Sequence, residues 1–540
     1  MAPTGTRSSS LLDRLERSAT SCLLIVLAGG ATAGSRDALL GTWRPDCLVG
    51  IPVSECLVRI GFPRRTGSRR FIHHDRSDAA VVLWMGIDIA VRAPHQASLT
   101  NEKGELLWSA HRFRTTAADL EKLWARLPSG HTPSDITIVM EPTRNAWVPL
   151  AAWFRRQGAQ VVLVSAERSS DLRAYYAKHT KSDRLDSVLL ARLPLLHPEG
   201  LHRERGIGPG DPLRRASKMH STLVKRRTTS LARLDALLEI LGPDWHAAFS
   251  ADLSNKTPLQ FLAAGYAEPH TVRRLGRARL TRFFYRHSRG AFGEAHADQI
   301  LAAAHASLEL WGDELAFSDL AEDIAIEARL ALALTAEIKE LDERIAILVA
   351  DRDPQGIITS APGVGAITGA VILGRLGDAS RFQSLAAVRS FSGLVPSLDS
   401  SGVSGRHGGP TKRGDHLLRE ALFISANQAR RLDPTLAAKY HRLMIESGKH
   451  HNSALCHIAT TLLTRVAACW RAQIPYQIRD VDGQAITRDE ARAIIQARYT
   501  IPDKVRRSRV TTGTGRRRKE SLRAPSTGPS NQHAKQSGAA

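Results

Sequence analysis

The order of apolar runs between residues 81 and 195 constrains the fold of this 540-residue chain more than any other feature. The run at 81–90 is strand-like, and two shorter strand-like segments follow at 96–100 and 106–108. Turns separate the three segments, and the second turn, at 101–104, begins with Asn and ends with Gly. Such short alternating runs joined by turns predict an antiparallel meander of three strands.

Helical and strand-like segments alternate after the predicted meander. Leucines at helical spacing predict a helix over 116–127, apolar runs predict strands at 135–140 and 160–164, and a helix between them covers 147–157. A polar helical stretch then leads into Lys181–Asp186. Three strands, helix, strand, helix, strand, helix is the order of an α/β RNase H-like (RuvC-like) domain, which we expect over residues 81–200.

Four carboxylates occupy meaningful places in this predicted domain. Asp88 lies inside an apolar strand, where an unpaired charge is costly unless a cation or hydrogen bonds compensate it. Glu141 follows the next core strand, at the edge where open α/β sheets bind ligands. Asp183 and Asp186 are three residues apart and share one helix face. Singly, each is more often a cap or a surface pair; together they could hold two divalent ions about 4 Å apart.

These segments resemble a known family. Gly-Ile-Asp-Ile-Ala at 86–90, Glu141-Pro-Thr, the strand at 161–164 and Lys-Ser-Asp-Arg-Leu-Asp at 181–186 are similar to the N-terminal DEDD domain of the IS110 family of insertion-sequence transposases. The resemblance implies that Asp88, Glu141, Asp183 and Asp186 are catalytic and bind Mg²⁺ (or Mn²⁺).

The segment from 210 to 350 is predicted to be helical. Leu334, Ile338, Leu341, Ile345 and Leu348 recur at the 3.5-residue period of a coiled coil. Packing between two helices of the same chain is an equally good interpretation of only two heptads.

A basic stretch with aromatic residues lies within this helical region. Seven arginines between Arg273 and Arg289, among them Arg282 and Arg286, are interleaved with Phe283, Phe284 and Tyr285. Arginine with aromatic residues suits phosphate pairing and base stacking on nucleic acid. The alternative is a solvated helix face whose aromatic side chains point inward.

A further domain is predicted over 355–475, mainly α-helical. It opens with Ser360-Ala-Pro-Gly-Val-Gly365 before a helix of small residues, which has the form of a helix-hairpin-helix turn. Glycines in such a turn let backbone N–H groups approach a DNA phosphate. Pro-Gly turns before helices are common, so the motif alone is weakly specific.

The rest of this domain is similar to the C-terminal transposase domain of the same family. Gly-Leu-Val-Pro at 393–396, Ser400-Ser-Gly and a Lys412 to Arg419 helix opening carry the likeness, with a glycine-rich flexible loop expected between the last two. The resemblance places the nucleophilic serine at Ser400, with Ser401 as its rival. Chemistry alone would favour a turn-forming serine there. Lys412, Arg413 and Arg419 are expected to contact backbone phosphates.

The resemblance, which covers 84–475, implies a DNA recombinase. Ser400 would form a 5′-phosphoserine intermediate beside the metal-bound carboxylates, the chain would act as a homo-oligomer, and a noncoding guide RNA would pair with target and donor DNA. Two alternatives remain: a RuvC-like metal-dependent nuclease in which Ser400 is structural, and a nucleic-acid-binding protein without catalysis.

Charge and composition agree with a nucleic-acid partner. The chain has 75 Lys+Arg against 53 Asp+Glu, a net charge of +22, and basic proteins commonly bind polyanions. Residues 501–540 contribute +8, and we expect a disordered basic tail from 500 onward. Five scattered cysteines and no run long enough to span a membrane indicate a cytoplasmic, nucleoid-associated protein. Residues 1–80 are expected to be an unfolded upstream extension.

Overall fold

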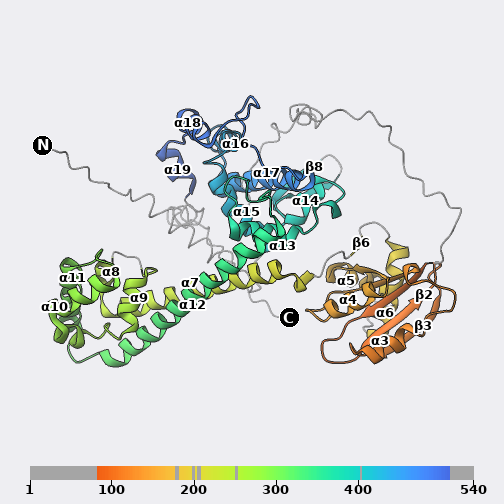
Figure 1. The fold of residues 1–540 in the computed structure, drawn as a ribbon, viewed down its shortest axis with the longest axis horizontal. Coiled ribbons are helices and arrows are strands. Elements are labelled where there is room, and N and C mark those ends of the chain that lie inside the picture. The colour runs from red at the N-terminus through yellow and green to blue at the C-terminus, as the bar shows by residue number, and fades with distance from the viewer. Residues whose placement is uncertain are drawn as a thin grey trace, which may run out of the picture. The chain divides into compact units, whose positions relative to one another are not determined.

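The computed structural model divides into two compact units, residues 1–348 and 349–540 (Figure 1). It describes residues 82–176, 182–197, 201–203, 208–249, 253–401 and 404–510. The expected N-terminal extension and the tail beyond 510 lie outside the described residues. Among the helices within these ranges, none is long and apolar enough to cross a membrane.

The first unit begins with a six-stranded sheet in the order β3-β2-β1-β4-β5-β6. The strands are β1 (Leu83–Asp88), β2 (His95–Thr100), β3 (Leu106–Phe113), β4 (Ile136–Met140), β5 (Gln160–Leu163) and β6 (His202–Arg203). β1, β2 and β3 pair antiparallel, whereas β4 is parallel to both β1 and β5. The predicted meander and the α/β order that follows it are therefore confirmed, and the short β6 is an antiparallel addition at the edge.

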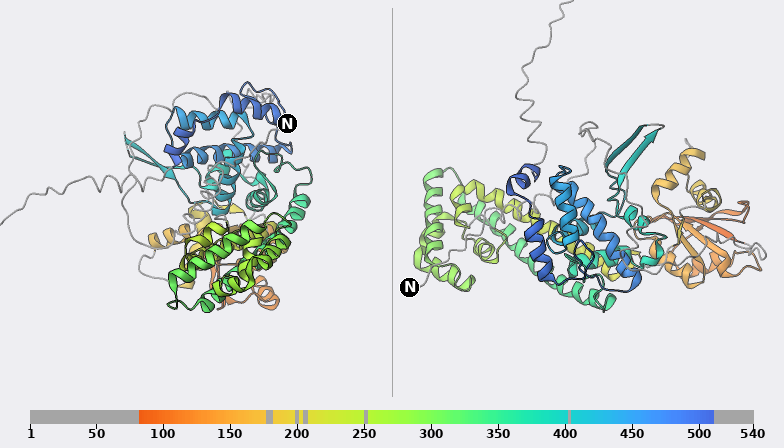
Figure 2. Two further views of the ribbon diagram at one scale, coloured as in Figure 1. Left: turned by 90° about the vertical axis from the view of Figure 1, so that its left-hand side faces the viewer. Right: turned by 90° about the horizontal axis from the view of Figure 1, so that it is seen from above.

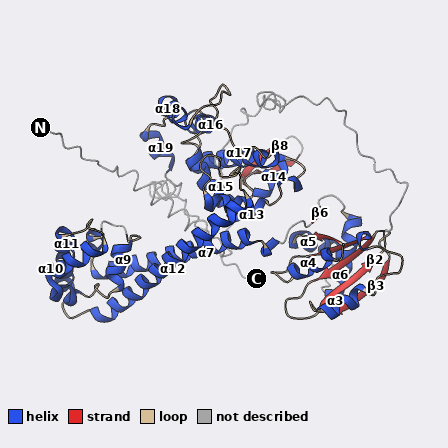
Figure 3. Ribbon diagram, in the orientation of Figure 1, coloured by secondary structure: helices blue, strands red, loops and turns tan. Residues whose placement is uncertain are grey.

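Four helices pack on this sheet (Figure 3). They are α3 (Ala117–Trp124), α4 (Trp147–Arg156), α5 (Ala166–Tyr176) and α6 (Asp183–Leu196). Met85 and Ile87 of β1 are fully buried in one core with Phe154 of α4. A second, smaller core joins Val139 of β4 to Leu190 of α6. Because successive side chains of a strand point to opposite faces, β1 supplies apolar groups to one layer and leaves Gly86 and Asp88 facing the other.

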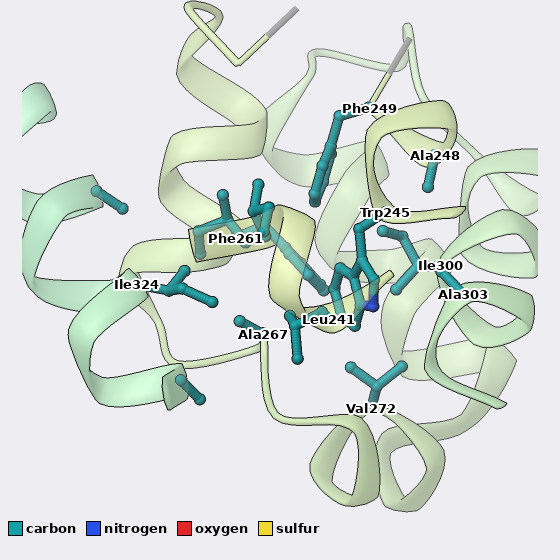
Figure 4. Close-up of a cluster of buried hydrophobic side chains, with 14 of the residues drawn as sticks. Leu241, Trp245, Ala248, Phe249, Phe261, Ala267, Val272, Ile300, Ala303 and Ile324 are labelled. Carbon is teal, nitrogen blue, oxygen red and sulfur yellow. The ribbon is translucent and has the colours of Figure 1, made fainter. Parts of the chain in front are cut away.

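The middle of the chain is helical, as predicted. Its helices are α7 (Pro212–Leu241), α8 (Pro243–Ala248), α9 (Lys256–Ala263), α10 (Pro269–His287, kinked at Gly276), α11 (Glu294–Trp311) and α12 (Phe317–Arg352). Trp245 and Phe261 are fully buried within one cluster (Figure 4). The indole N–H of Trp245 donates to Ser307 Oγ at 2.8 Å, which satisfies the buried donor.

The long helices α7 and α12 contact each other in antiparallel directions (Figure 2). His220 Nε2 lies 3.0 Å from Asp342 Oδ1, and Arg227 Nε donates to Thr335 Oγ1 at 2.7 Å. Residue numbers therefore rise along one helix as they fall along the other. Leu341 and Ile345 of the heptad seam are buried. Packing between helices of one chain, our alternative to a coiled coil, is thus observed within this unit.

The aromatic residues of α10 divide between core and surface. Phe284 is buried and Phe283 packs partly against the same cluster, whereas the Tyr285 side chain is 65% exposed. Arg282 and Arg286 are exposed. The alternative that the aromatic side chains point inward is therefore confirmed for Phe283 and Phe284. Tyr285 instead lies on the surface beside Arg282 and Arg286.

The second unit is mainly α-helical, as predicted, and its described residues also include a β-hairpin that we did not predict. Its elements are α13 (Ala366–Leu376), α14 (Leu385–Ser392), β7 (Pro396–Ser401), β8 (Ser404–Pro410), α15 (His416–Ala429), α16 (Pro434–Ile445), α17 (His451–Ala472), α18 (Arg488–Arg498) and α19 (Asp503–Val510).

Three sequence predictions for this unit need correction. The segment expected to be a flexible loop after Ser400 forms strand β8, because β7 and β8 pair antiparallel. The helix expected from Lys412 starts at His416, where Asp415 accepts from Leu417 N and Leu418 N and caps it. The chain folds beyond 475 into α18 and α19, so the expected tail is helical over Asp503–Val510.

Candidate active site

Gly86 sets the distance between the central strand and the helix that carries two of the candidate carboxylates. A Cβ at Gly86 would overlap Ser187 O and Ala191 N, both backbone atoms of α6. Close contact therefore requires glycine at this position. Two hydrogen bonds fix the same approach: Ser98 Oγ to Ser187 Oγ at 2.8 Å, and Thr100 Oγ1 to Ala191 O at 3.3 Å.

Three of the four predicted carboxylates line one small pocket. Asp88 ends β1, Glu141 follows β4, and Asp186 lies in the first turn of α6. The pocket is completed by Ser169 and Arg173 of α5 and by leucines of α6. The structure thus brings together residues that are 53 and 45 positions apart in the sequence.

Asp183 lies at the start of α6, exposed and outside the lining of this pocket. Its charge still reaches the pocket, because it contributes to the raised pKa of Asp88. Ser182 caps the helix by accepting from Leu185 N. Asp183 and Asp186 both lie in the first turn, where the partial positive charge of the helix N-terminus favours carboxylates.

Burial is the main cause that raises the pKa of Asp88 to about 6. The negative charges of Asp186, Asp183 and Glu141 raise it further, while Arg173 lowers it. All four predicted carboxylates therefore interact electrostatically, and strongly perturbed acids in a pocket are typical of functional sites.

Helix α5 supplies two partners that the sequence did not reveal. Arg173 Nε lies 2.6 Å from Asp186 Oδ1, and Ser169 Oγ donates to Glu141 Oε2. Neither residue belongs to a motif that we recognised. The only signal was their position in the polar helix that precedes Lys181–Asp186.

Gln96 is a third residue that sequence reasoning missed. It pairs directly with Asp88 across β1 and β2, so both side chains point to the α6 side of the sheet. Gln96 is 7% exposed, and its Oε1 atom has no hydrogen-bond partner among the described residues. A buried carbonyl oxygen without a donor or a cation is unusual in proteins.

The chemistry of this set fits a divalent cation with oxygen ligands. Mg²⁺ is bound through carboxylates, and the mutual repulsion that raises the pKa of Asp88 would be relieved by a positive ion. The described side chains do not already form a group of three metal ligands. Arg173 instead contacts Asp186 Oδ1 and Ser169 donates to Glu141 Oε2, so these two oxygens would be available to an ion only if the α5 contacts rearranged.

Ser400 and Ser401 are the last two residues of strand β7. Ser400 pairs with Gly405 and Ser401 with Ser404 of β8, so both serines lie near the tip of the hairpin.

Two glycines close the base of this hairpin. A Cβ at Gly414 would overlap backbone atoms of Phe391, Ser392 and Gly393, and Gly393 itself has φ +67°. Thr411 N donates to Val395 O at 2.9 Å, and Lys412 N donates to Gly393 O at 3.1 Å. The Gly-Leu-Val-Pro and Lys-Arg-Gly elements are thus in direct backbone contact.

The predicted phosphate-binding cations differ in exposure. Lys412 and Arg413 are exposed in the turn before α15. Arg419 is half-buried and its NH1 group donates to Gly414 O at 2.7 Å and Ser392 O at 3.3 Å. Burial lowers the pKa of Arg419. Arg419 therefore braces the hairpin base, and its contact with a phosphate stays a prediction.

Two family models match separate parts of the chain. Residues 85–243 match a model of DEDD transposases of the IS110 type, described as a transposase. Residues 355–442 match the model described as the IS116/IS110/IS902 transposase family. The first match contains the carboxylate pocket, and the second contains the β-hairpin and the glycine contact at its base.

Proteins of three insertion elements are similar over most of their length. The 44.8 kDa protein of IS116 from Streptomyces clavuligerus is 26% identical over 74% of this chain and 94% of that protein. The 42 kDa protein of IS900 from Mycobacterium paratuberculosis is 27% identical over 73% of this chain and 97% of its own. The 43.6 kDa protein of IS110 from Streptomyces coelicolor is 26% identical over 75% of this chain and 97% of its own.

Proposed function

Because the chain carries both transposase domains of the IS110/IS116/IS902 family, we propose that this insertion-sequence transposase cuts and rejoins DNA through a covalent serine intermediate. The observation that carries the proposal is the convergence of Asp88, Glu141 and Asp186 on one pocket, with Asp183 within electrostatic reach. The strand order of the sheet supports an RNase H-like fold for this domain.

The proposed nucleophile is Ser400. Its Oγ attacks a DNA phosphorus, so that an Oγ–P bond forms and the bond from phosphorus to the 3′ oxygen breaks. The serine proton passes to a base, and the departing 3′ oxygen takes up a proton. The 5′ phosphate remains on the serine until a 3′ hydroxyl of the recombination partner attacks it and releases Ser400.

Asp88, Glu141, Asp183 and Asp186 are the residues that we propose hold Mg²⁺ or Mn²⁺. When bound, such an ion supplies positive charge that stabilises the phosphorane-like transition state. The residues of the chain itself position the site: Gly86 admits α6, and the helix N-terminus orients its two aspartates. Displacement of Arg173 frees Asp186 for this role.

A guide RNA and an oligomeric state are further parts of the proposal. The exposed Arg282, Tyr285 and Arg286 of α10 offer cations and an aromatic ring to a nucleic acid. A homo-oligomer would let Ser400 of one copy serve the carboxylates of another. RNA binding is testable by crosslinking the chain to transcripts from the element ends, with Tyr285→Ala and Arg282→Gln expected to weaken it.

The experiment that tests the mechanism is capture of the covalent intermediate. The protein is incubated with labelled DNA from the element ends and Mg²⁺, and is then denatured. We expect the denatured protein to retain the labelled DNA in an adduct that protease digestion destroys. Ser400→Ala should abolish the adduct, while Ser401→Ala should retain it.

The alternatives give different results in the same assay. Full strand cleavage by Ser400→Ala would identify a nuclease that uses water and overturn the serine mechanism. Unchanged recombination by Asp88→Ala and Glu141→Ala would show that the carboxylates have no catalytic role.

A further inference from the structure

The face of β2 that lies against α6 is polar and buried. Gln96, Ser98 and Thr100 occupy alternate positions on this face. The residues between them, Ala97 and Leu99, belong to the apolar core on the other side of the sheet. A buried polar side chain is costly unless it is hydrogen-bonded, so each of the three polar side chains requires a partner.

Helix α6 provides the partners of two of these side chains. Ser98 Oγ lies 2.8 Å from Ser187 Oγ, and Thr100 Oγ1 donates to Ala191 O at 3.3 Å. Two residues along the strand therefore correspond to four residues along the helix, because both steps cover about 6–7 Å.

Gln96 lies between two of the candidate carboxylates. The same spacing brings it opposite Asp183, which lies one turn before Ser187 in α6. Within the sheet it pairs directly with Asp88 of β1. Directly opposed side chains of antiparallel strands have Cβ atoms about 5 Å apart, and both of these face α6. Gln96 is thus on the side of Asp88 that is remote from β4 and Glu141.

The side-chain oxygen of Gln96 lacks a donor. Oε1 is buried, and none of the described residues donates a hydrogen bond to it. Its neighbour on the other flanking strand, Arg112 of β3, is exposed and does not bond to this oxygen. Asp88 and Asp183 can only accept hydrogen bonds when ionised. A cation would therefore satisfy the amide oxygen and both carboxylates together.

We propose that the Gln96 side-chain oxygen is an additional, uncharged ligand of a divalent cation bound between Asp88 and Asp183. Glu141 and Asp186 line the pocket on the other side of Asp88. An uncharged oxygen completes the coordination of the ion without increasing the repulsion among the four carboxylates. The inference rests on the metal site proposed above, to which it adds a fifth residue.

The test measures cation binding and stability in the same variant. The protein is the full chain with Ser400→Ala and without DNA, so the result does not depend on a serine intermediate. Mn²⁺ is the probe, and the electron paramagnetic resonance signal of free Mn²⁺ reports how much is bound. Gln96→Met nearly keeps the side-chain volume but removes the oxygen. We expect its Mn²⁺ affinity to fall about tenfold.

Stability distinguishes a ligand from a structural residue. In EDTA, the melting temperature of Gln96→Met should equal or exceed that of the parent chain, because an unsatisfied buried acceptor has been removed. Gln160→Met makes the same change on β5, outside the lining of the carboxylate pocket, and should leave Mn²⁺ affinity unchanged. A Gln96→Met chain that melts lower in EDTA but binds Mn²⁺ like its parent would overturn the inference.

A second variant keeps the test decisive if Gln96→Met does not fold. Gln96→Glu retains the shape of the side chain and adds a negative charge to it. We expect this variant to bind Mn²⁺ about threefold or more tightly and to melt at a lower temperature in EDTA at pH 7. Unchanged Mn²⁺ affinity would place the side chain away from the ion and contradict the proposal.

Asp88→Asn separates failure of this inference from failure of the metal site itself. Mn²⁺ binding that is the same in Asp88→Asn and in the parent chain would refute the metal site and the role of Gln96 together. Binding that is lost in Asp88→Asn but normal in Gln96→Met would refute the role of Gln96 alone.

Discussion

The guanidinium of Arg173 is the positive partner of Asp186, with Nε 2.6 Å from Oδ1. The Asp186 side chain is 11% exposed, so little solvent is available to replace Arg173. The same arginine lowers the pKa of Asp88 while three carboxylates raise it. In the absence of a bound ion, the pocket therefore depends on a side chain of α5 for its charge balance.

Replacing Arg173 should destabilise the metal-free protein and increase its response to Mg²⁺. Arg173→Gln leaves a nearly buried carboxylate without its cation, a change that costs about 3 kcal/mol or more in fully buried pairs and less here. A divalent ion would restore the missing charge. Thermal melting in EDTA and in MgCl₂ measures both effects.

Arg184→Gln is the control for this experiment, since Arg184 is exposed on α6 beside the same carboxylates. It should melt like the wild type in both buffers. If Arg173→Gln were destabilised equally with and without Mg²⁺, Arg173 would be only a structural partner and not a competitor of a metal ion.

Asp88→Asn should stabilise the protein at neutral pH but not in acid. The pKa of Asp88 is raised from 3.8 to about 6 in the folded chain, so folding opposes its ionisation as the pH rises from about 4 to 6. Removing the charge should raise the free energy of unfolding at pH 7 by about 1 to 2 kcal/mol, a value reduced for solvent screening.

The measurement is the melting temperature in EDTA at pH 4 and pH 7. The difference between Asp88→Asn and the wild type should be positive at pH 7 and vanish near pH 4. Asp171→Asn, an exposed change on α5, should show no such dependence. A difference that is the same at both pH values would refute a raised pKa.

The sheet was predictable from sequence because its strands are local patterns. The apolar runs around Met85 and Ile138 and the Asn101–Gly104 turn each reflect neighbouring residues, and their order fixes the topology. The convergence of Asp88, Glu141 and Asp186 was predictable for a related reason: once the order of the elements is known, the ends of β1 and β4 and the first turn of α6 are expected at one edge of the sheet.

The partners of the carboxylates were not predictable, because nothing local marks them. Ser169, Arg173 and Gln96 acquire their roles only when α5 and β2 are placed against the pocket. The hairpin strand β8 was missed because its glycines normally indicate a loop, and here they pair with β7.

Gly86→Ala tests whether close packing of α6 on β1 positions the carboxylates. The new methyl group would overlap the backbone of Ser187 and Ala191, which cannot rotate away. Overpacking of this kind typically costs about 1–3 kcal/mol, and here the displaced helix also carries Asp183 and Asp186. We expect a lower melting temperature together with loss of DNA cleavage.

Gly293→Ala serves as the reference for that substitution. Gly293 lies at the start of α11 without a positive φ, and a Cβ there meets nothing within 4 Å. This variant should retain stability and cleavage. A fully stable and active Gly86→Ala chain would show that α6 does not need this close approach.

Gly414→Ala addresses the base of the hairpin that carries Ser400. A Cβ at Gly414 would overlap the backbone of Phe391, Ser392 and Gly393, so the two motif elements would have to separate. We expect a loss of about 1–3 kcal/mol in the free energy of unfolding, measured by urea denaturation, and loss of the covalent DNA adduct. Gly409→Ala is the matched control in β8, because its Cβ meets nothing within 4 Å. Both substitutions add the same methyl group, one at the base of the hairpin and the other within β8. If the two variants had equal stability and equal adduct yield, the glycine contact would not position Ser400.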